Sequence, residues 1–117
     1  MIHYNVWFAF KDGIEERSGL AVIEGFLREL CGMGEASEFR LLKNSSEGPR
    51  TKLPRFQAII EFTDDAALAQ AMRKQAARGI HHGGHGRIVD VVSEFRVEIF
   101  RLLAPDAIEV MPYACEI

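Results

Sequence analysis

The segment that most constrains the fold is residues 3–10, which read His-Tyr-Asn-Val-Trp-Phe-Ala-Phe. Successive side chains of a β-strand point to opposite faces of the sheet, so this segment divides into two sets. Both sets contain large groups that can be buried, which indicates a central strand covered on both faces. A chain of 117 residues supplies cover for one face, and a second copy of the sheet is the natural cover for the other. The first set is Tyr4, Val6, Phe8 and Phe10, and the second is His3, Asn5, Trp7 and Ala9.

The rest of the chain alternates between helical and extended patterns. Apolar residues recur every three or four positions from residue 20 to residue 31, which predicts an amphipathic helix closed by glycine at Gly32 and Gly34. Residues 63–65 supply side-chain oxygens that can cap a second helix, which we expect to stop at Gly79. We expect strands at 35–44, 55–62 and 94–103, a polar loop at 44–54, and one or two helical turns at 87–93.

Two glycines fall inside the first helical pattern. Gly19 and Gly25 each cost about 1 kcal/mol relative to alanine in a helix interior. Either they permit a close approach of the helix to the sheet or to a ligand, or they are ordinary tolerated glycines. The sequence leaves both alternatives open.

The element order is strand, helix, two strands, helix, strand. It predicts an α+β domain of the ferredoxin-like β-α-β-β-α-β type, with two helices on one face of a four-stranded antiparallel sheet. Trp7, Ile59 and Phe100 would then lie on the uncovered face, where an apolar patch marks an interface. We therefore expect a homodimer through the open sheet face. Residues 1–103 form the predicted domain, and the tail, residues 104–117, is apolar enough to dock on the partner subunit.

Composition argues against several classes of function. The net charge is -3, and basic residues alternate with acidic ones, so nucleic-acid binding has no support. No apolar run reaches the roughly 18 residues that span a bilayer, and the first residues lack the pattern of a signal peptide. We expect a cytoplasmic protein without a membrane partner. Cys31 and Cys115 are too few for a disulfide framework and read as reduced thiols.

Several motifs in this order resemble the dimeric α/β-barrel superfamily. They are a first strand ending Phe10-Lys11-Asp12-Gly13, an amphipathic helix, Glu61-Phe62 before a capped helix, and a His-x-x-His segment, His82 and His85. Within the superfamily the likeness is to the stress-responsive barrel domain proteins, which include a plant polyketide cyclase, and it covers roughly residues 3 to 103. The resemblance implies a dimer in which the two sheets face each other, with a cavity between each sheet and its helices.

Two branches of the superfamily suggest residue roles. In the cyclase branch a histidine on the first strand and the second histidine of the His-x-x-His segment act on the substrate. The resemblance therefore points to His85, whereas the strand position falls on Tyr4, and His3 lies one residue away on the opposite face. In the haem-degrading monooxygenase branch, Asn5 and either His81 or His82 match two functional positions, but the second helix has no tryptophan.

The histidine cluster His81, His82 and His85 leaves three interpretations open. It can be a solvated connection, an acid–base group near a cavity mouth, or a metal site. The spacing is no recognised zinc signature and no acidic or cysteine ligand is adjacent, so we predict no metal.

An apolar pocket with few polar groups is the usual form of a small-molecule site. Tyr4 is either a plain core residue or the polar tip of such a pocket. The predicted catalytic residues are His85 and Tyr4, and the predicted ligand-binding residues are Val6, Phe8, Phe26, Phe56, Met72 and His82.

The leading hypothesis is a homodimer that binds a small apolar or aromatic molecule between sheet and helices. As an enzyme it would be a cofactor-free cyclase or isomerase, with His85 as the base and Tyr4 orienting the substrate. The alternatives are a non-catalytic carrier or sensor of a lipid-like or aromatic ligand, a haem-degrading or cofactor-free monooxygenase-like enzyme, and a structural dimer with a filled core. The sequence does not decide whether the protein is an enzyme.

Overall fold

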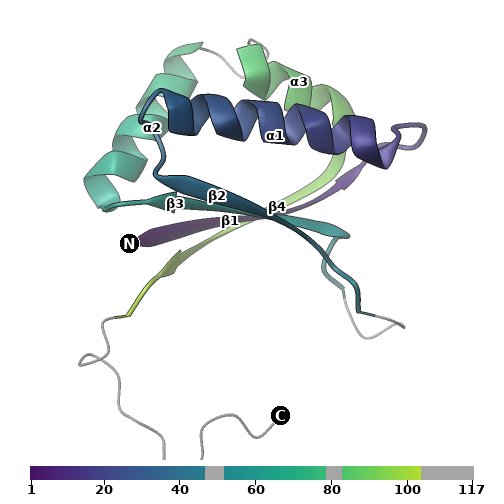
Figure 1. The fold of residues 1–117 in the computed structure, drawn as a ribbon, viewed down its shortest axis with the longest axis horizontal. Helices are drawn as coiled ribbons and strands as arrows, with labels where there is room; N and C mark the ends of the chain where they lie inside the picture. Colours follow the sequence, from purple (N-terminus) through teal and green to yellow (C-terminus); the bar gives the residue numbers. More distant parts are fainter. Residues whose placement is uncertain (47–51, 79–82, 104–117) are drawn as a thin grey trace, which may run out of the picture.

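The structure, a computed structural model, describes residues 1–46, 52–78 and 83–103. Its four strands form one antiparallel sheet in the order β2-β3-β1-β4, so the first strand is central, as predicted. Three helices lie on one face of this sheet (Figure 1), and the predicted ferredoxin-like α+β fold is confirmed. The elements are β1 (Ile2–Phe10), α1 (Glu16–Gly32), β2 (Glu38–Lys43), β3 (Phe56–Phe62), α2 (Asp65–Arg78), α3 (Gly83–Val91) and β4 (Val92–Arg101).

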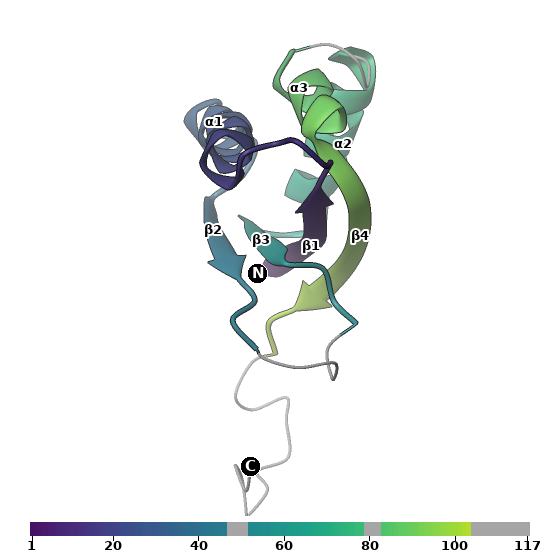
Figure 2. The same cartoon turned by 90° about the vertical axis from the view of Figure 1, so that its right-hand side faces the viewer.

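The helices divide the sheet between them. Helix α1 lies above the end of the sheet formed by β2, and α3 lies above β4 at the other end (Figure 2). No helix in the described ranges is long and apolar enough to cross a membrane.

The start of the third helix differs from the expectation. Helix α3 begins at Gly83 instead of Arg87, so residues expected in a glycine-rich connection are helical. Glycine disfavours helix by about 1 kcal/mol per residue, but α3 packs against α1, and Gly86 is buried. Tertiary packing therefore overrides the local preference. Strand β4 follows α3 directly at Val92, two positions before the expected Glu94.

Some expectations fall outside the described residues. They concern residues 47–51 of the polar loop, His81, His82 and the tail at 104–117. Of His85, the backbone is described and the side chain is not.

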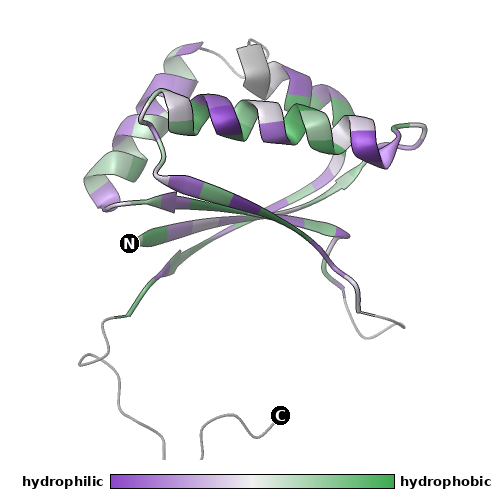
Figure 3. Cartoon of the chain, viewed as in Figure 1, coloured by the Kyte–Doolittle hydropathy of each residue, from purple (hydrophilic) through white to green (hydrophobic). Residues whose placement is uncertain are grey.

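The side chains of β1 alternate as the sequence predicted. Val6 pairs with Ala58, and Phe8 pairs with Phe56, so these side chains share the face below the helices. Figure 3 shows the same alternation of hydrophobic and hydrophilic residues along the strands, and a hydrophobic stripe along α1. The buried core between the two layers comprises Ile2, Val6, Phe8, Ile23, Leu27, Leu30, Ala36, Phe56, Ala58, Ile60, Phe62 and Ala71.

Helix α1 ends in a Schellman motif centred on Gly34. The Gly34 N–H donates to the Cys31 carbonyl at 3.1 Å, and the Glu35 N–H donates to the Leu30 carbonyl at 2.9 Å. Gly34 has φ +72°, a left-handed conformation that glycine adopts without the steric penalty of other residues. Strand β2 therefore begins at Glu38 rather than at the expected residue 35, because Glu35 belongs to this turn.

The two glycines of α1 lie in different surroundings. A Cβ on Gly19 would lie 2.6 Å from Cε1 of Phe10, whereas a Cβ on Gly25 would meet nothing within 4 Å. Gly19 therefore permits a close approach of the helix to β1, and Gly25 is a tolerated glycine.

The sheet face away from the helices, here called the open face, is mixed in character. The predicted apolar residues Trp7, Ile59 and Phe100 lie on it, and the rings of Trp7 and Phe100 meet edge to face at 6.4 Å. Charged side chains lie around this apolar centre. The open face consists of Glu38, Arg40 and Leu42 of β2, Gln57, Ile59 and Glu61 of β3, His3, Asn5, Trp7 and Ala9 of β1, and Glu94, Arg96, Glu98 and Phe100 of β4.

Candidate ligand-binding cavity

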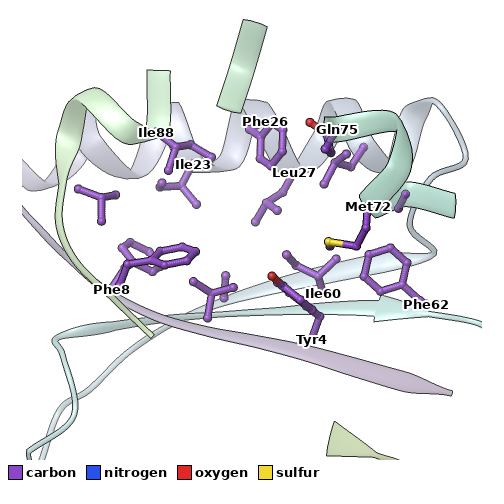
Figure 4. Close-up of a pocket in the computed structure, with 16 residues that line it drawn as sticks. Tyr4, Phe8, Ile23, Phe26, Leu27, Ile60, Phe62, Met72, Gln75 and Ile88 are labelled. Atoms are coloured by element: carbon purple, nitrogen blue, oxygen red, sulfur yellow. The ribbon is translucent and has the colours of Figure 1, made fainter. Parts of the chain in front are cut away.

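A cavity of about 150 Å³ lies between the sheet and the three helices (Figure 4). Exposed Met72 of α2 and Phe95 of β4 are among its lining residues, so the cavity reaches the surface between these two elements. The other lining residues come from β1, α1, β3 and α3 and from further positions of α2 and β4. They are Tyr4, Val6, Phe8, Ile23, Phe26, Leu27, Leu30, Ala58, Ile60, Phe62, Ala71, Gln75, Ile88 and Val92.

The cavity lies beside two small side chains among larger neighbours. Ala58 of β3 and Ala71 of α2 both line the cavity, and both are fully buried. Their neighbours along each element are larger, Ile60 and Phe62 on β3 and Met72 on α2. A buried alanine between large residues leaves volume that the surroundings cannot close by relaxing.

Among the lining residues that the structure describes, two have side chains with polar atoms. The first is Tyr4, whose ring packs edge to face on Phe62 with centroids 6.4 Å apart. Figure 4 shows its hydroxyl rising from the sheet into the cavity. Within the described part of the chain the hydroxyl has no protein hydrogen-bond partner, and it is accessible because Tyr4 is only half-buried. Burial raises the pKa of Tyr4, so its hydroxyl is a neutral donor at physiological pH.

The second polar group is the Gln75 amide, on the helix side of the cavity (Figure 4). Its Nε2 donates to Oε2 of Glu35 at 3.1 Å. Glu35 in turn accepts from Nη2 of Arg78 at 2.7 Å, and its side chain is only 1% exposed. The three residues form a chain of polar contacts that fixes the end of α2 to the turn after α1.

The structure brings most of the predicted pocket residues together. Tyr4, Val6, Phe8, Phe26 and Met72 all line the cavity.

Phe56, also predicted to line the cavity, lies outside its walls. Its ring stacks on Phe8 with centroids 5.7 Å apart and also meets Phe10 at 5.1 Å. Phe56 pairs with Phe8 across the sheet, and these aromatic contacts hold its ring in the core beside the cavity rather than at its surface.

The predicted histidines are described less fully. His82 lies outside the described residues, and the backbone of His85 lies in the first turn of α3, one turn before the cavity residue Ile88. Among the described residues no group of three or more His, Cys, Asp or Glu could hold a metal ion. Cys31 is a half-buried free thiol, and Cys115 lies in the undescribed tail.

His3 and Asn5 lie on the open face, away from the cavity. His3 Nε2 is 3.4 Å from Oε1 of Glu61. The Asn5 amide donates to the His3 carbonyl at 3.2 Å and accepts from Gln57 Nε2 at 2.8 Å. Asn5 therefore cannot contact a molecule in the cavity, which removes one of the two residues that suggested the monooxygenase branch.

Gln75 was not assigned to the site from the sequence, and neither were several apolar lining residues, among them Ile23, Leu27 and Ile60. A signal was present, because Gln75 follows Leu68, Ala71 and Met72 at helical spacing and is a polar residue on a stripe that faces the core. Its partner Glu35 lies 40 residues earlier in the chain, and no local pattern connects the two.

Comparisons with known proteins agree with this fold. A family model described as "Family of unknown function (DUF6614)" matches residues 1–112. No curated protein matches the sequence.

Solved structures with this architecture come from several organisms. The crystal structure of a protein from Arabidopsis thaliana is 14% identical with a TM-score of 0.69, and the match covers 89% of this chain and 97% of that one. A DABB family protein with a ferredoxin-like fold from Mesorhizobium loti is 20% identical with a TM-score of 0.61, and the match covers 88% of this chain and 97% of that one.

A third structure, from Thermobifida fusca, is described as a dimeric ferredoxin-like protein of unknown function. It is 10% identical with a TM-score of 0.58, and the match covers 86% of this chain and 90% of that one. At these identities the likeness shows the ferredoxin-like fold, and the expected resemblance is confirmed as a resemblance in fold.

Proposed function

This chain belongs to the DUF6614 family, whose function is not known, and we propose that it is a homodimeric protein that binds a small apolar or aromatic molecule in the cavity. The observation that carries the proposal is the unpartnered hydroxyl of Tyr4 among apolar walls. Small-molecule sites combine such walls with a few polar groups that orient the ligand.

The size of the cavity limits the ligand. An engineered apolar cavity of about 150 Å³ binds benzene, and this cavity has a volume of about 150 Å³. A single ring therefore fits without rearrangement. A longer lipid-like chain would have to extend through the opening beside Met72 and Phe95.

The binding proposal is tested with toluene as the probe and a variant that fills the cavity. Ala71→Leu adds three carbon atoms to a lining residue, and Ala69→Leu makes the same change at an exposed position of the same helix. We expect toluene to perturb the methyl NMR resonances of Ile23, Leu27 and Ile60 in the native protein and in Ala69→Leu, and not in Ala71→Leu. Absence of any effect of toluene, and of the hydroxylated ring compound phenol, in the native protein would refute the proposal.

The proposed dimer forms through the open face. The edge strand β4 adds to this surface, because it and the residues after it carry highly exposed apolar side chains, among them Phe100 at 55% and Leu102 at 65%. An exposed edge strand with such side chains is a pairing surface that a monomer would have to protect. Dimerisation would cover it.

Sedimentation velocity tests the dimer. We expect the native chain to sediment as a particle of twice 13.2 kDa, and Phe100→Arg to shift it towards the monomer. Ala21→Arg introduces the same charge on the exposed side of α1 and should leave the dimer intact. A native chain that sediments as a 13.2 kDa monomer at micromolar concentration contradicts the proposal.

A second candidate function is cofactor-free proton transfer, with His85 as the base and Tyr4 orienting the substrate. Two observations favour it: the free Tyr4 hydroxyl, and the place of His85 one helical turn before the cavity residue Ile88. Once a substrate has been identified, His85→Ala should abolish its turnover in an activity assay and leave its binding affinity unchanged. A native protein that binds its ligand and returns it unchanged would be a carrier or sensor.

A further inference from the structure

The two polar groups of the cavity differ in their freedom to rotate. The Tyr4 hydroxyl turns about its C–O bond and can donate or accept. The Gln75 amide has less freedom, because its Nε2 donates a hydrogen bond to Glu35. The Glu35 side chain is 1% exposed and accepts a second hydrogen bond from Arg78.

The contact with Glu35 decides which end of the Gln75 amide is available to a ligand. An ionised carboxylate only accepts hydrogen bonds, so the amide NH₂ must face Glu35. The contact observed, Nε2 of Gln75 to Oε2 of Glu35 at 3.1 Å, has this orientation. The side-chain oxygen Oε1 is then turned away from Glu35, and within the described ranges no hydrogen bond to it occurs.

We propose that Gln75 determines the specificity of the cavity by accepting a hydrogen bond at Oε1, and that the ligand is a neutral single-ring compound with a hydroxyl or amino donor. The proposal rests on the proposed function and narrows its ligand class. Glu35 is the positioning residue, since it acts through Gln75 and does not line the cavity.

Charge argues against an anionic ligand. The lining residues include no Lys, Arg or His among those the structure describes, and the atom that Gln75 leaves without a described hydrogen bond is an oxygen. A carboxylate in this site would lose its hydration and find no cation among the described lining residues; the Tyr4 hydroxyl could donate one hydrogen bond, which does not replace a counter-charge for a buried ion. The Arg78 guanidinium is already paired with Glu35.

Three probes of similar size separate the possibilities. Phenol carries the donor, toluene lacks it, and benzoate is an anion at pH 7. We expect phenol to bind the native protein and benzoate not to bind, as measured by calorimetry. A donor that finds its acceptor inside an apolar site is worth about tenfold or more in affinity over a site without one.

Gln75→Leu removes the acceptor, and Gln70→Leu makes the same change at an exposed position of the same helix. In Gln75→Leu we expect phenol affinity to fall about tenfold while toluene affinity is kept or rises. Gln70→Leu should leave both affinities at native values. If Gln75→Leu fails to fold, Gln75→Met provides an unbranched substitute.

Glu35→Gln tests the positioning role, because an amide at this place can donate or accept and no longer fixes the Gln75 orientation. We expect the ratio of phenol to toluene affinity to fall in this variant, a change that a loss of stability alone would not produce.

The outcomes distinguish this inference from the proposed function. If neither toluene nor phenol binds the native protein, both are overturned. If toluene binds but the ratio of phenol to toluene affinity is the same in Gln75→Leu as in the native protein, the cavity binds ligands and Gln75 does not select them. Benzoate binding as tightly as phenol would also overturn the inference.

Discussion

The close approach of α1 to β1 at Gly19 predicts that two glycines of one helix respond to alanine with different energies. At Gly19 the new Cβ would lie 2.6 Å from Cε1 of Phe10, a distance that requires the ring to move. The Phe10 ring packs against Phe8 at 5.6 Å and Phe56 at 5.1 Å, so its movement disturbs two further rings. At Gly25 the new Cβ would enter open space.

The magnitude follows from two opposing contributions. Alanine is favoured over glycine in a helix interior by about 1 kcal/mol, and overpacking a core costs about 1–3 kcal/mol. Gly25→Ala has only the first contribution and should stabilise the protein by about 1 kcal/mol. Gly19→Ala has both, so its unfolding free energy should lie about 1–3 kcal/mol below that of Gly25→Ala.

Urea unfolding followed by circular dichroism measures this difference. All variants should be compared at one protein concentration, because dimerisation would link stability to concentration. A third variant, Phe10→Leu, removes the ring atoms that the new Cβ of Gly19→Ala would contact. The destabilisation caused by Gly19→Ala should therefore be smaller in the Phe10→Leu background, with a coupling energy of about 0.5 kcal/mol or more. Equal stabilisation by Gly19→Ala and Gly25→Ala would refute the reasoning, because it would mean that the aromatic cluster yields freely.

Three other predictions follow from single groups. Burial raises the folded-state pKa of Tyr4. The neutral Tyr4 side chain therefore contributes to the unfolding free energy below the unfolded-state pKa of about 10, and this contribution is lost as the pH rises through the folded-state pKa. The fall in unfolding free energy above about pH 10, measured by urea unfolding, should be smaller in Tyr4→Phe. Gly34→Ala forces a left-handed alanine at φ +72° and should lower the unfolding free energy by about 1–2 kcal/mol, as measured by urea unfolding. Burial, followed by the nearby Glu38 carboxylate, raises the pKa of the Cys31 thiol. In a Cys115→Ser variant, Cys31 should therefore react with a disulfide reagent at pH 8 more slowly in the folded protein than in the protein unfolded by urea.

The fold was predictable because each element satisfies a local pattern that agrees with its tertiary role. Strict alternation from His3 to Phe10 has one interpretation as a central strand, and the pairing of Val6 with Ala58 confirms which set faces the helices. The start of α3 was not predictable in the same way. Gly83 and Gly84 disfavour a helix when taken locally, and the contact of α3 with α1 that offsets this preference appears only in three dimensions.

The cavity was predictable in its walls and less so in its polar groups. Alternation in β1 and helical spacing in α1 and α2 select the residues that face the core, which is how Val6, Phe26 and Met72 could be assigned. Which of these touch open volume depends on the sizes of their neighbours across the core, and Phe56 therefore faces the core without lining the cavity. The orientation of Gln75 depends on Glu35, which a turn far away in sequence places beside it.

The cavity itself is an argument for binding, because open volume in a core this small is costly. At about 24 cal/mol per Å³, a cavity of about 150 Å³ lowers stability by at most about 3–4 kcal/mol relative to a filled core. Water entering beside Met72 and Phe95 reduces this cost without removing it. A domain whose total stability is of the order of 5–15 kcal/mol gives up a large share of it to this space. A leucine at Ala58 or Ala71 would recover part of that stability through a single substitution. A core shaped by packing alone would have filled the space between Tyr4 and the helices, so the two alanines that leave it open favour the proposal that a ring binds there.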